Sequence, residues 1–127
     1  MRSDKLNQKW EEINSKNPEE LTNTERIWYT IEPLLQLGLI DHYINYGFDF
    51  HNETMEDLKH IGELEILNLM LEVNNKFEGE IPKDIDERNE ELADINENFI
   101  EEIDNKFWKL APEAEVRLDK FIAKNFD

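Results

Sequence analysis

The stretch Asp84–Glu102, DIDERNEELADINENFIEE, organises this chain of 127 residues. It holds nine carboxylates and one basic residue, Arg88. Its apolar residues recur at spacings of three, four and seven, which is typical of one helical face. On a helical wheel they fall within roughly 80° of arc, and the acids fill a separate arc of roughly 160° on the opposite side. The pattern predicts one amphipathic helix, about 28 Å long, with a continuous acidic face.

The charge of the whole chain narrows the choice of partner. The net charge is −17, and residues 31–109 hold 21 acidic residues against 6 basic ones. Nucleic acid and anionic membrane are therefore excluded as direct ligands, because both would repel the chain. A basic protein partner, a cationic ligand and simple solubility remain open.

Other features of the sequence indicate a cytoplasmic protein. There is no cysteine, so we expect neither a disulfide framework nor thiolate chemistry. The first residues lack the apolar core of a signal peptide, and no apolar run approaches the length of a membrane span.

The chain is predicted to be all-α, a single compact domain of about six helices. Residues 1–22 form an N-terminal helix and linker, and residues 23–127 form the helical domain. The helix over residues 63–77 is apolar on most of its surface and is predicted to be central and most buried. The acidic helix is predicted to continue through residues 84–108, with Asn96 or Asn98 as the positions where it would falter. Pro112 is then expected to reset the chain before a last helix.

Three shorter signals predict where other helices begin and end. Ser3 or Asp4 is expected to cap the first helix. Thr54-x-x-Asp57 is similar to a capping box and predicts a helix start at Thr54. Gly47 is a natural left-handed residue for the end of the helix before it.

A series of short motifs runs from residue 24 to the end of the chain. They are Thr24-Glu25-Arg26, Gly38, Asn45-Tyr46-Gly47, Thr54-Met55, Leu58, Ile61-Gly62, Asp86-Glu87-Arg88, Asp104-Asn105-Lys106-Phe107-Trp108 and Phe121-Ile122 before Asn125. Their order resembles domain-of-unknown-function family 4375, a bacterial family whose best-described member is a DNA mimic protein. The resemblance implies an acidic protein that presents DNA-like charge to a DNA-binding regulator, and it supplies no catalytic residues.

The acids at the centre of the exposed arc are the candidate partner-binding surface. Carboxylates at phosphate-like spacing would occupy the Lys and Arg side chains of a basic DNA-binding protein. The alternative is a solvated helix face whose acidity serves only solubility. The predicted binding residues are Glu87, Glu90, Asp94, Glu97 and Glu101, extended by the loop acids Glu78, Glu80 and Asp84.

A single helix reproduces the charge density of DNA but not the path of its two phosphate strands. Further acids, or a second subunit in a homodimer, would have to supply the rest of the surface. The candidate acids are Glu53, Glu56, Asp57, Glu63 and Glu65.

Arg88 lies near the edge of the apolar stripe rather than among the acids. We expect it to form an anchoring ion pair with a carboxylate of a neighbouring element, with an anion contact as the alternative. His51, beside Asp49, is expected to be an exposed histidine, with cation binding as the alternative. Asp57-x-x-His60 is half of a di-iron motif whose second half is missing. We therefore predict no metal site and no cofactor.

Enzymatic activity is not expected. The sequence contains no G-x-S-x-G motif and no P-loop, and no carboxylate lies in an identifiable apolar pocket that would raise its pKa. The remaining alternative to a DNA mimic is a protein-binding module of another kind, such as an immunity or antitoxin-like protein.

The large aromatic residues are expected to form core clusters, and two or three of them exposed together would instead indicate a dimer interface. They are Trp10, Trp28, Phe99, Phe107 and Trp108.

Overall fold

The computed structural model describes residues 2–127, which form seven α-helices, two short 3₁₀ helices and no β-strand. The predicted all-α class is confirmed, with seven α-helices rather than about six. In chain order the elements are α1 (Asp4–Ser15), η1 (Pro18–Glu20), α2 (Asn23–Leu37), α3 (Leu39–Ile44), η2 (Tyr46–Phe50), α4 (His51–His60), α5 (Leu64–Asn74), α6 (Ile85–Ala93) and α7 (Glu97–Phe126).

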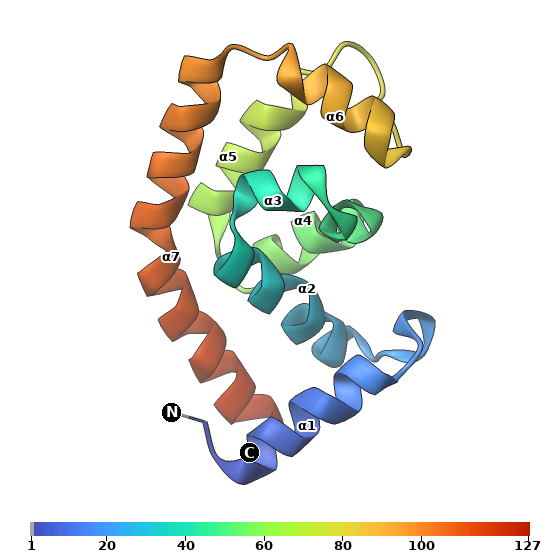
Figure 1. The fold of residues 1–127 in the computed structure, drawn as a ribbon. Helices are drawn as coiled ribbons and strands as arrows, with labels where there is room; N and C mark the ends of the chain where they lie inside the picture. The colour runs from blue at the N-terminus through green and yellow to red at the C-terminus, as the bar shows by residue number, and fades with distance from the viewer. Residues whose placement is uncertain (1) are drawn as a thin grey trace.

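Helix α7 runs along the whole length of the molecule (Figure 1). It has 30 residues, which corresponds to about 45 Å of helix. Helices α2, α3 and α5 all pack against it. Its buried residues recur every three or four positions, as one helical face requires. They are Ile103, Phe107, Ala111, Ala114, Leu118 and Ile122.

The prediction that Pro112 resets the chain was wrong, because α7 continues through it. A proline inside a helix has no N–H to donate, so the carbonyl of Trp108, four residues earlier, loses its usual partner. Pro112 is exposed and Trp108 is 42% exposed, so water reaches this side of the helix. The lost hydrogen bond is least costly at such a position.

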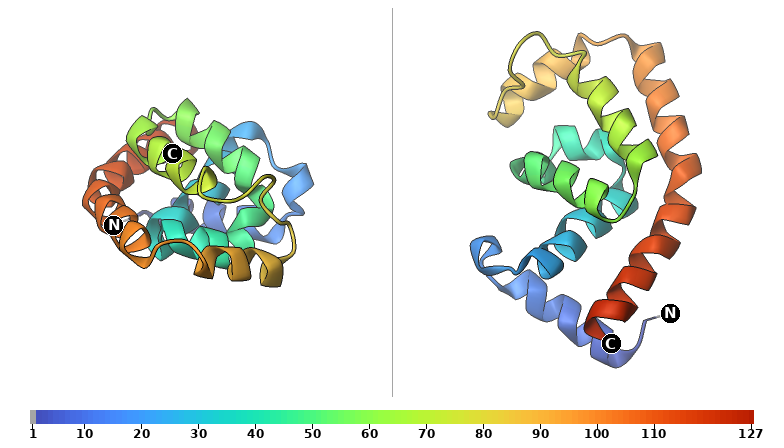
Figure 2. Two further views of the ribbon diagram at one scale, coloured as in Figure 1. Left: turned by 90° about the horizontal axis from the view of Figure 1, so that it is seen from above. Right: turned by 180° about the vertical axis from the view of Figure 1, so that it is seen from behind.

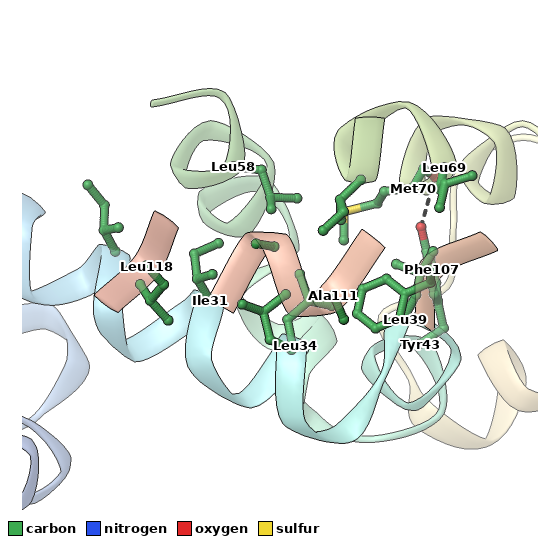
Figure 3. Packing of buried hydrophobic residues seen from close by; sticks show 14 of the residues in the cluster. Ile31, Leu34, Leu39, Tyr43, Leu58, Leu69, Met70, Phe107, Ala111 and Leu118 are labelled. Atoms are coloured by element: carbon green, nitrogen blue, oxygen red, sulfur yellow. Dashed lines mark hydrogen bonds between the residues drawn. The ribbon is translucent and has the colours of Figure 1, made fainter. Parts of the chain in front are cut away.

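Helix α2 is the central element, in contact with α1, α3, α4 and α7. Its Trp28, Ile31 and Leu35 are at most 1% exposed. Figure 3 shows residues of α2, α4, α5 and α7 meeting in one core. Helix α2 also contains a proline, Pro33, and remains unbroken.

Helix α5 is therefore not the central helix that the sequence predicted. Its Ile66, Met70 and Val73 are fully buried. However, Leu64 and Leu71 are 54% and 43% exposed. The helix is as rich in apolar residues as predicted, but one side of it faces solvent. The central helix is α2 instead.

The predicted helix boundaries differ in accuracy. Ser3 caps α1, as expected, by accepting a hydrogen bond from the backbone N–H of Leu6. Thr54 instead lies inside α4, which begins at His51, and its hydroxyl donates to the carbonyl of Phe50. Gly47 lies in η2 and has no positive φ, so the predicted left-handed end was wrong.

The left-handed residue in this region is Gly38, with φ of 104°, between α2 and α3. A Cβ at this position would stand 2.9 Å from a ring carbon of Trp108 on α7. Both the backbone conformation and the close approach of Trp108 therefore favour glycine.

The single acidic helix predicted over Asp84–Glu102 is also wrong, because α6 ends at Ala93 and α7 begins at Glu97. Asn96 is the cap of α7, and its side-chain oxygen accepts hydrogen bonds from the backbone N–H groups of Asn98 and Phe99. Asparagine satisfies these free N–H groups better than it supports a helix interior. The chain therefore turns here, and α6 lies across one end of the molecule (Figure 1).

Helix α1 is part of the same core as the rest of the chain. Its Leu6 and Ile13 are buried, and the ring of Trp10 stacks on Trp28 with 5.1 Å between ring centres. The division into residues 1–22 and 23–127 stays a prediction.

The cap at the start of α7 allows a direct test of the turn between α6 and α7. We expect Asn96→Ala to lower the free energy of unfolding by about 1 kcal/mol, because two backbone N–H groups lose their acceptor. Urea denaturation measures the change. Asn98→Ala, at the second residue of the same helix and also exposed, should have little effect, and equal losses for the two variants would contradict the role given to Asn96.

Candidate functional site

All eight predicted binding acids are exposed, and none of them forms an ion pair within residues 2–127. We call this set the acidic end. It consists of Glu78, Glu80, Asp84, Glu87, Glu90, Asp94, Glu97 and Glu101.

The acidic end occupies the loop before α6, the helix α6 itself and the first turns of α7. Figures 1 and 2 place these elements at one end of the molecule, opposite α1. Residues 78–102 hold eleven carboxylates and two basic residues, Lys83 and Arg88. The break at residues 94–96 divides these acids between two helices that point in different directions, so the charged surface follows a bent path.

Two of the proposed additional acids are not part of any charged surface. Asp57 and Glu63 are only 1% and 3% exposed. Asp57 accepts hydrogen bonds from Arg26 at 2.7 and 3.2 Å and from the hydroxyl of Thr30 at 2.7 Å. Glu63 pairs with Arg117 at 2.9 Å. These buried carboxylates join helices of the core. The prediction that Asp57 and Glu63 extend the charged surface was therefore wrong.

Two further buried carboxylates bind basic residues at the end of the molecule near α1. Glu32 pairs with Arg2, and Glu25 pairs with Lys9 and Lys16 at 3.1 and 2.9 Å. A hydrogen bond from the Thr22 backbone N–H, followed by those from the lysines, lowers the pKa of Glu25 to about 2. The basic side chains of these pairs are therefore unavailable to the acidic end, and within residues 78–102 the exposed basic residue is Lys83.

Arg88 is buried within the acidic end, at 1% exposure, and its predicted ion pair was wrong. Its guanidinium instead donates hydrogen bonds to backbone carbonyls and lies 4.3 Å from the ring centre of Phe48. The acceptors are the carbonyl oxygens of Tyr43, Pro82, Lys83 and Asn45.

These bonds hold α6 against α3 and the segment that follows it. Two acceptors, Tyr43 and Asn45, lie more than forty residues earlier in the chain. A lysine offers a single ammonium group, whereas the guanidinium has five N–H donors in a fixed plane and can serve several carbonyls at once.

His42 and His51 are both buried, at 5% and 8% exposure, so the expectation of an exposed His51 was wrong. Nε2 of His42 lies 2.9 Å from Nδ1 of His51, and Nε2 of His51 lies 3.0 Å from Oδ1 of Asn74. The hydroxyl of Tyr43 lies 2.6 Å from the same oxygen. The aromatic ring of Phe48 stacks on His51, with 4.4 Å between ring centres.

Burial is the main cause of unusual pKa values in this pair. It lowers the pKa of His42 to about 3, helped by the neighbouring His51. It also lowers the pKa of His51 to about 4, against the hydrogen bond to Asn74, which favours the charged form. Both histidines are therefore neutral at pH 7. A sequence gives no signal for this pair, because His42 lies on α3, His51 on α4 and their partner Asn74 on α5.

No group of three or more His, Asp and Glu side chains within residues 2–127 is arranged to hold a metal ion. The two residues of the half-motif Asp57-x-x-His60 have different surroundings in the structure. Asp57 binds Arg26, whereas His60 is exposed beside Phe121. In the described part of the chain, no helix is both long and apolar enough for a membrane span.

The aromatic residues lie mainly in the core. Trp28 and Phe107 are fully buried, and Trp10 and Phe99 are partly buried against the core. Of this group only Trp108 is exposed, at 42%. The group therefore forms no exposed aromatic patch of the kind that would indicate a dimer interface.

Arg88 can be tested by Arg88→Leu. We expect the free energy of unfolding to fall by about 2–4 kcal/mol, because buried carbonyls lose their donors. Urea and thermal denaturation measure the loss. Lys83→Leu removes the same charge from an exposed neighbour and should change stability by less than about 0.5 kcal/mol. A loss for Arg88→Leu no larger than for Lys83→Leu would contradict the anchoring role.

The histidine pair predicts a pH dependence of stability. Unfolded histidines have a pKa of about 6.5, so below this pH the unfolded chain binds more protons and the free energy of unfolding falls. His51→Leu should make this slope shallower between pH 6.5 and 5, by about 1 kcal/mol per pH unit. Urea denaturation at several pH values measures it. The exposed His60 provides the control, and a His51→Leu slope equal to that of His60→Leu would refute the assignment.

Residues 19–125, from η1 to the last turn of α7, match the family described as DMP19-like protein. The match covers the acidic end, Arg88 and the histidine pair. It agrees with the resemblance to a DNA mimic-like family, although the family number 4375 is not confirmed. Neither the curated proteins nor the solved structures contain a match. The chain belongs to the DMP19-like protein family.

Proposed function

We propose that this protein is a non-enzymatic DNA mimic that binds a basic DNA-binding protein in competition with DNA. The observation that carries the proposal is the acidic end, whose eight exposed carboxylates have no ion-pair partner of their own. The only other support is membership of a DNA mimic-like family.

The distribution of the charges fits such a role better than a role in solubility alone. A solubilising surface needs charges that are spread over the molecule and of both signs. In this protein eleven carboxylates lie within residues 78–102. Of the two basic residues in that range, Arg88 is buried. Their bent path over α6 and α7 is also closer to the curved course of phosphates along a groove than one straight helix would be.

Charge complementarity would provide the mechanism. Lys and Arg side chains that contact phosphates in the DNA complex would contact carboxylates instead, and the negative field would speed the encounter. Screening by salt should weaken such a complex steeply, as it weakens DNA binding itself. The partner is thus defined by its phosphate-binding surface, and DNA and this protein cannot occupy that surface together.

The proposal predicts the effect of reversing charge at the acidic end. In the variant, Glu90, Asp94, Glu97 and Glu101 are all changed to Lys. We expect affinity for the partner to fall on the order of 100-fold, because like charges then face each other across the interface. Capture of partners from a host lysate, with and without excess duplex DNA, identifies the partner, and titration of the purified partner gives the affinity.

A matched control reverses four exposed acids that lie outside the acidic end. They are Glu11, Glu19, Glu20 and Glu115. This variant has the same net charge as the first and should keep its affinity. Equal binding by both variants in their folded state would refute the assignment to the acidic end. A captured partner that duplex DNA fails to displace would instead favour the immunity or antitoxin-like alternative.

A further inference from the structure

A second surface feature lies between α2 and the α3–η2 segment. It is an open cleft of about 790 Å³, within the usual range for ligand sites. Tyr29, Leu37, Tyr46 and Phe50 contribute to its walls. Leu37 and Tyr46 are 62% and 73% exposed, which is unusual for large apolar side chains with no partner.

One buried group in this cleft has an unused hydrogen-bonding atom. The Asn74 amide is oriented with Nδ2 toward the sulfur of Met55, so its oxygen accepts from His51 Nε2. Nδ1 of the neutral His51 is therefore an acceptor, and His42 Nε2 must donate to it. This leaves Nδ1 of His42 as a bare acceptor.

His42 is 95% buried and lines the cleft, and its Nδ1 has no hydrogen-bond partner within residues 2–127. This atom lies beside Gly47, which also lines the cleft, and a Cβ at Gly47 would stand 3.0 Å from it. This acceptor is open to the cleft, where an occupant can donate a hydrogen bond to it.

The charged residues that line the cleft also restrict the kind of occupant that it can bind. Asp41 and Asp49 line it, and no lysine or arginine does. The occupant should therefore be cationic as well as a hydrogen-bond donor, and it should have an apolar part that fits between aromatic walls.

We propose that the cleft receives an arginine side chain of the basic partner. Arginine alone among the common side chains combines a permanent positive charge, several donors and a flat group that stacks on aromatic rings. Its guanidinium would donate to His42 Nδ1 and lie near the aspartates, with its aliphatic stem against the apolar walls. The identity of the occupant as part of a protein partner rests on the proposed function.

The cleft and the acidic end would then have different tasks. Exposed charges mainly steer the encounter and are screened by salt, whereas an arginine inserted into a pocket fixes position and slows dissociation. The two surfaces can be tested independently, because the cleft can be probed without the partner.

The test titrates the full chain with N-acetyl-L-arginine methylamide and follows backbone and histidine ring nitrogens by NMR. We expect saturable binding in the millimolar range, with the largest ring shift at His42 Nδ1. N-acetyl-L-norleucine methylamide has a similar stem without the charge and should bind at least about 5-fold more weakly. Equal binding of the two probes, or no response at His42, would overturn the proposal.

Three variants locate the binding. Tyr46→Ala and Asp41→Asn should each weaken arginine binding about 3-fold, because a stacking surface or a charge is lost. Gly47→Ala, which places a methyl group against His42 Nδ1, should abolish the histidine shift. Binding unchanged in all three, with their folds confirmed by NMR, would refute the site.

The four-residue charge reversal of the acidic end serves as the control and should leave arginine binding at the cleft within about 2-fold. If that variant loses the partner but keeps the probe, both proposals stand. If it keeps the partner, the proposed function fails while the probe still decides the cleft.

Discussion

The acidic end depends on one buried guanidinium. Helix α6 has nine residues and many like charges, so it is too short and too repulsive to be stable alone. Arg88 holds it in place through carbonyl oxygens rather than carboxylates. This choice of acceptor matters, since an ion pair would have neutralised one of the surface acids. The anchor therefore fixes the helix without forming an ion pair with any of the exposed carboxylates of the acidic end.

Much of the fold was predictable because its signals are local. Helical periodicity of three and four and the cap at Ser3 depend only on neighbouring residues. The exposure of the five helical acids was predictable for the same reason, since they lie opposite an apolar stripe. They are Glu87, Glu90, Asp94, Glu97 and Glu101. Even the break in the acidic helix had a local signal in Asn96, but the apolar stripe continues across it at Ile95 and Phe99 and hides the turn.

The features that sequence reasoning missed are formed by residues far apart in the chain. Arg26 and Asp57 are separated by 31 residues, and Arg117 and Glu63 by 54. In an acidic chain every basic residue has many possible partners, so charge alone cannot identify the pair. The cleft was missed for a related reason. His42 is buried and bound to His51 only because its ring meets other helices, which the sequence does not reveal.

The two ends of the described chain lie together, far from the acidic end (Figure 1). Phe126 packs on Trp28, and Arg2 pairs with Asp119 of α7. A tag, fluorophore or surface attachment at either terminus would therefore project away from α6 and the start of α7. The molecule can be tethered by either end in binding measurements, or joined to another domain, with its charged surface facing free solution.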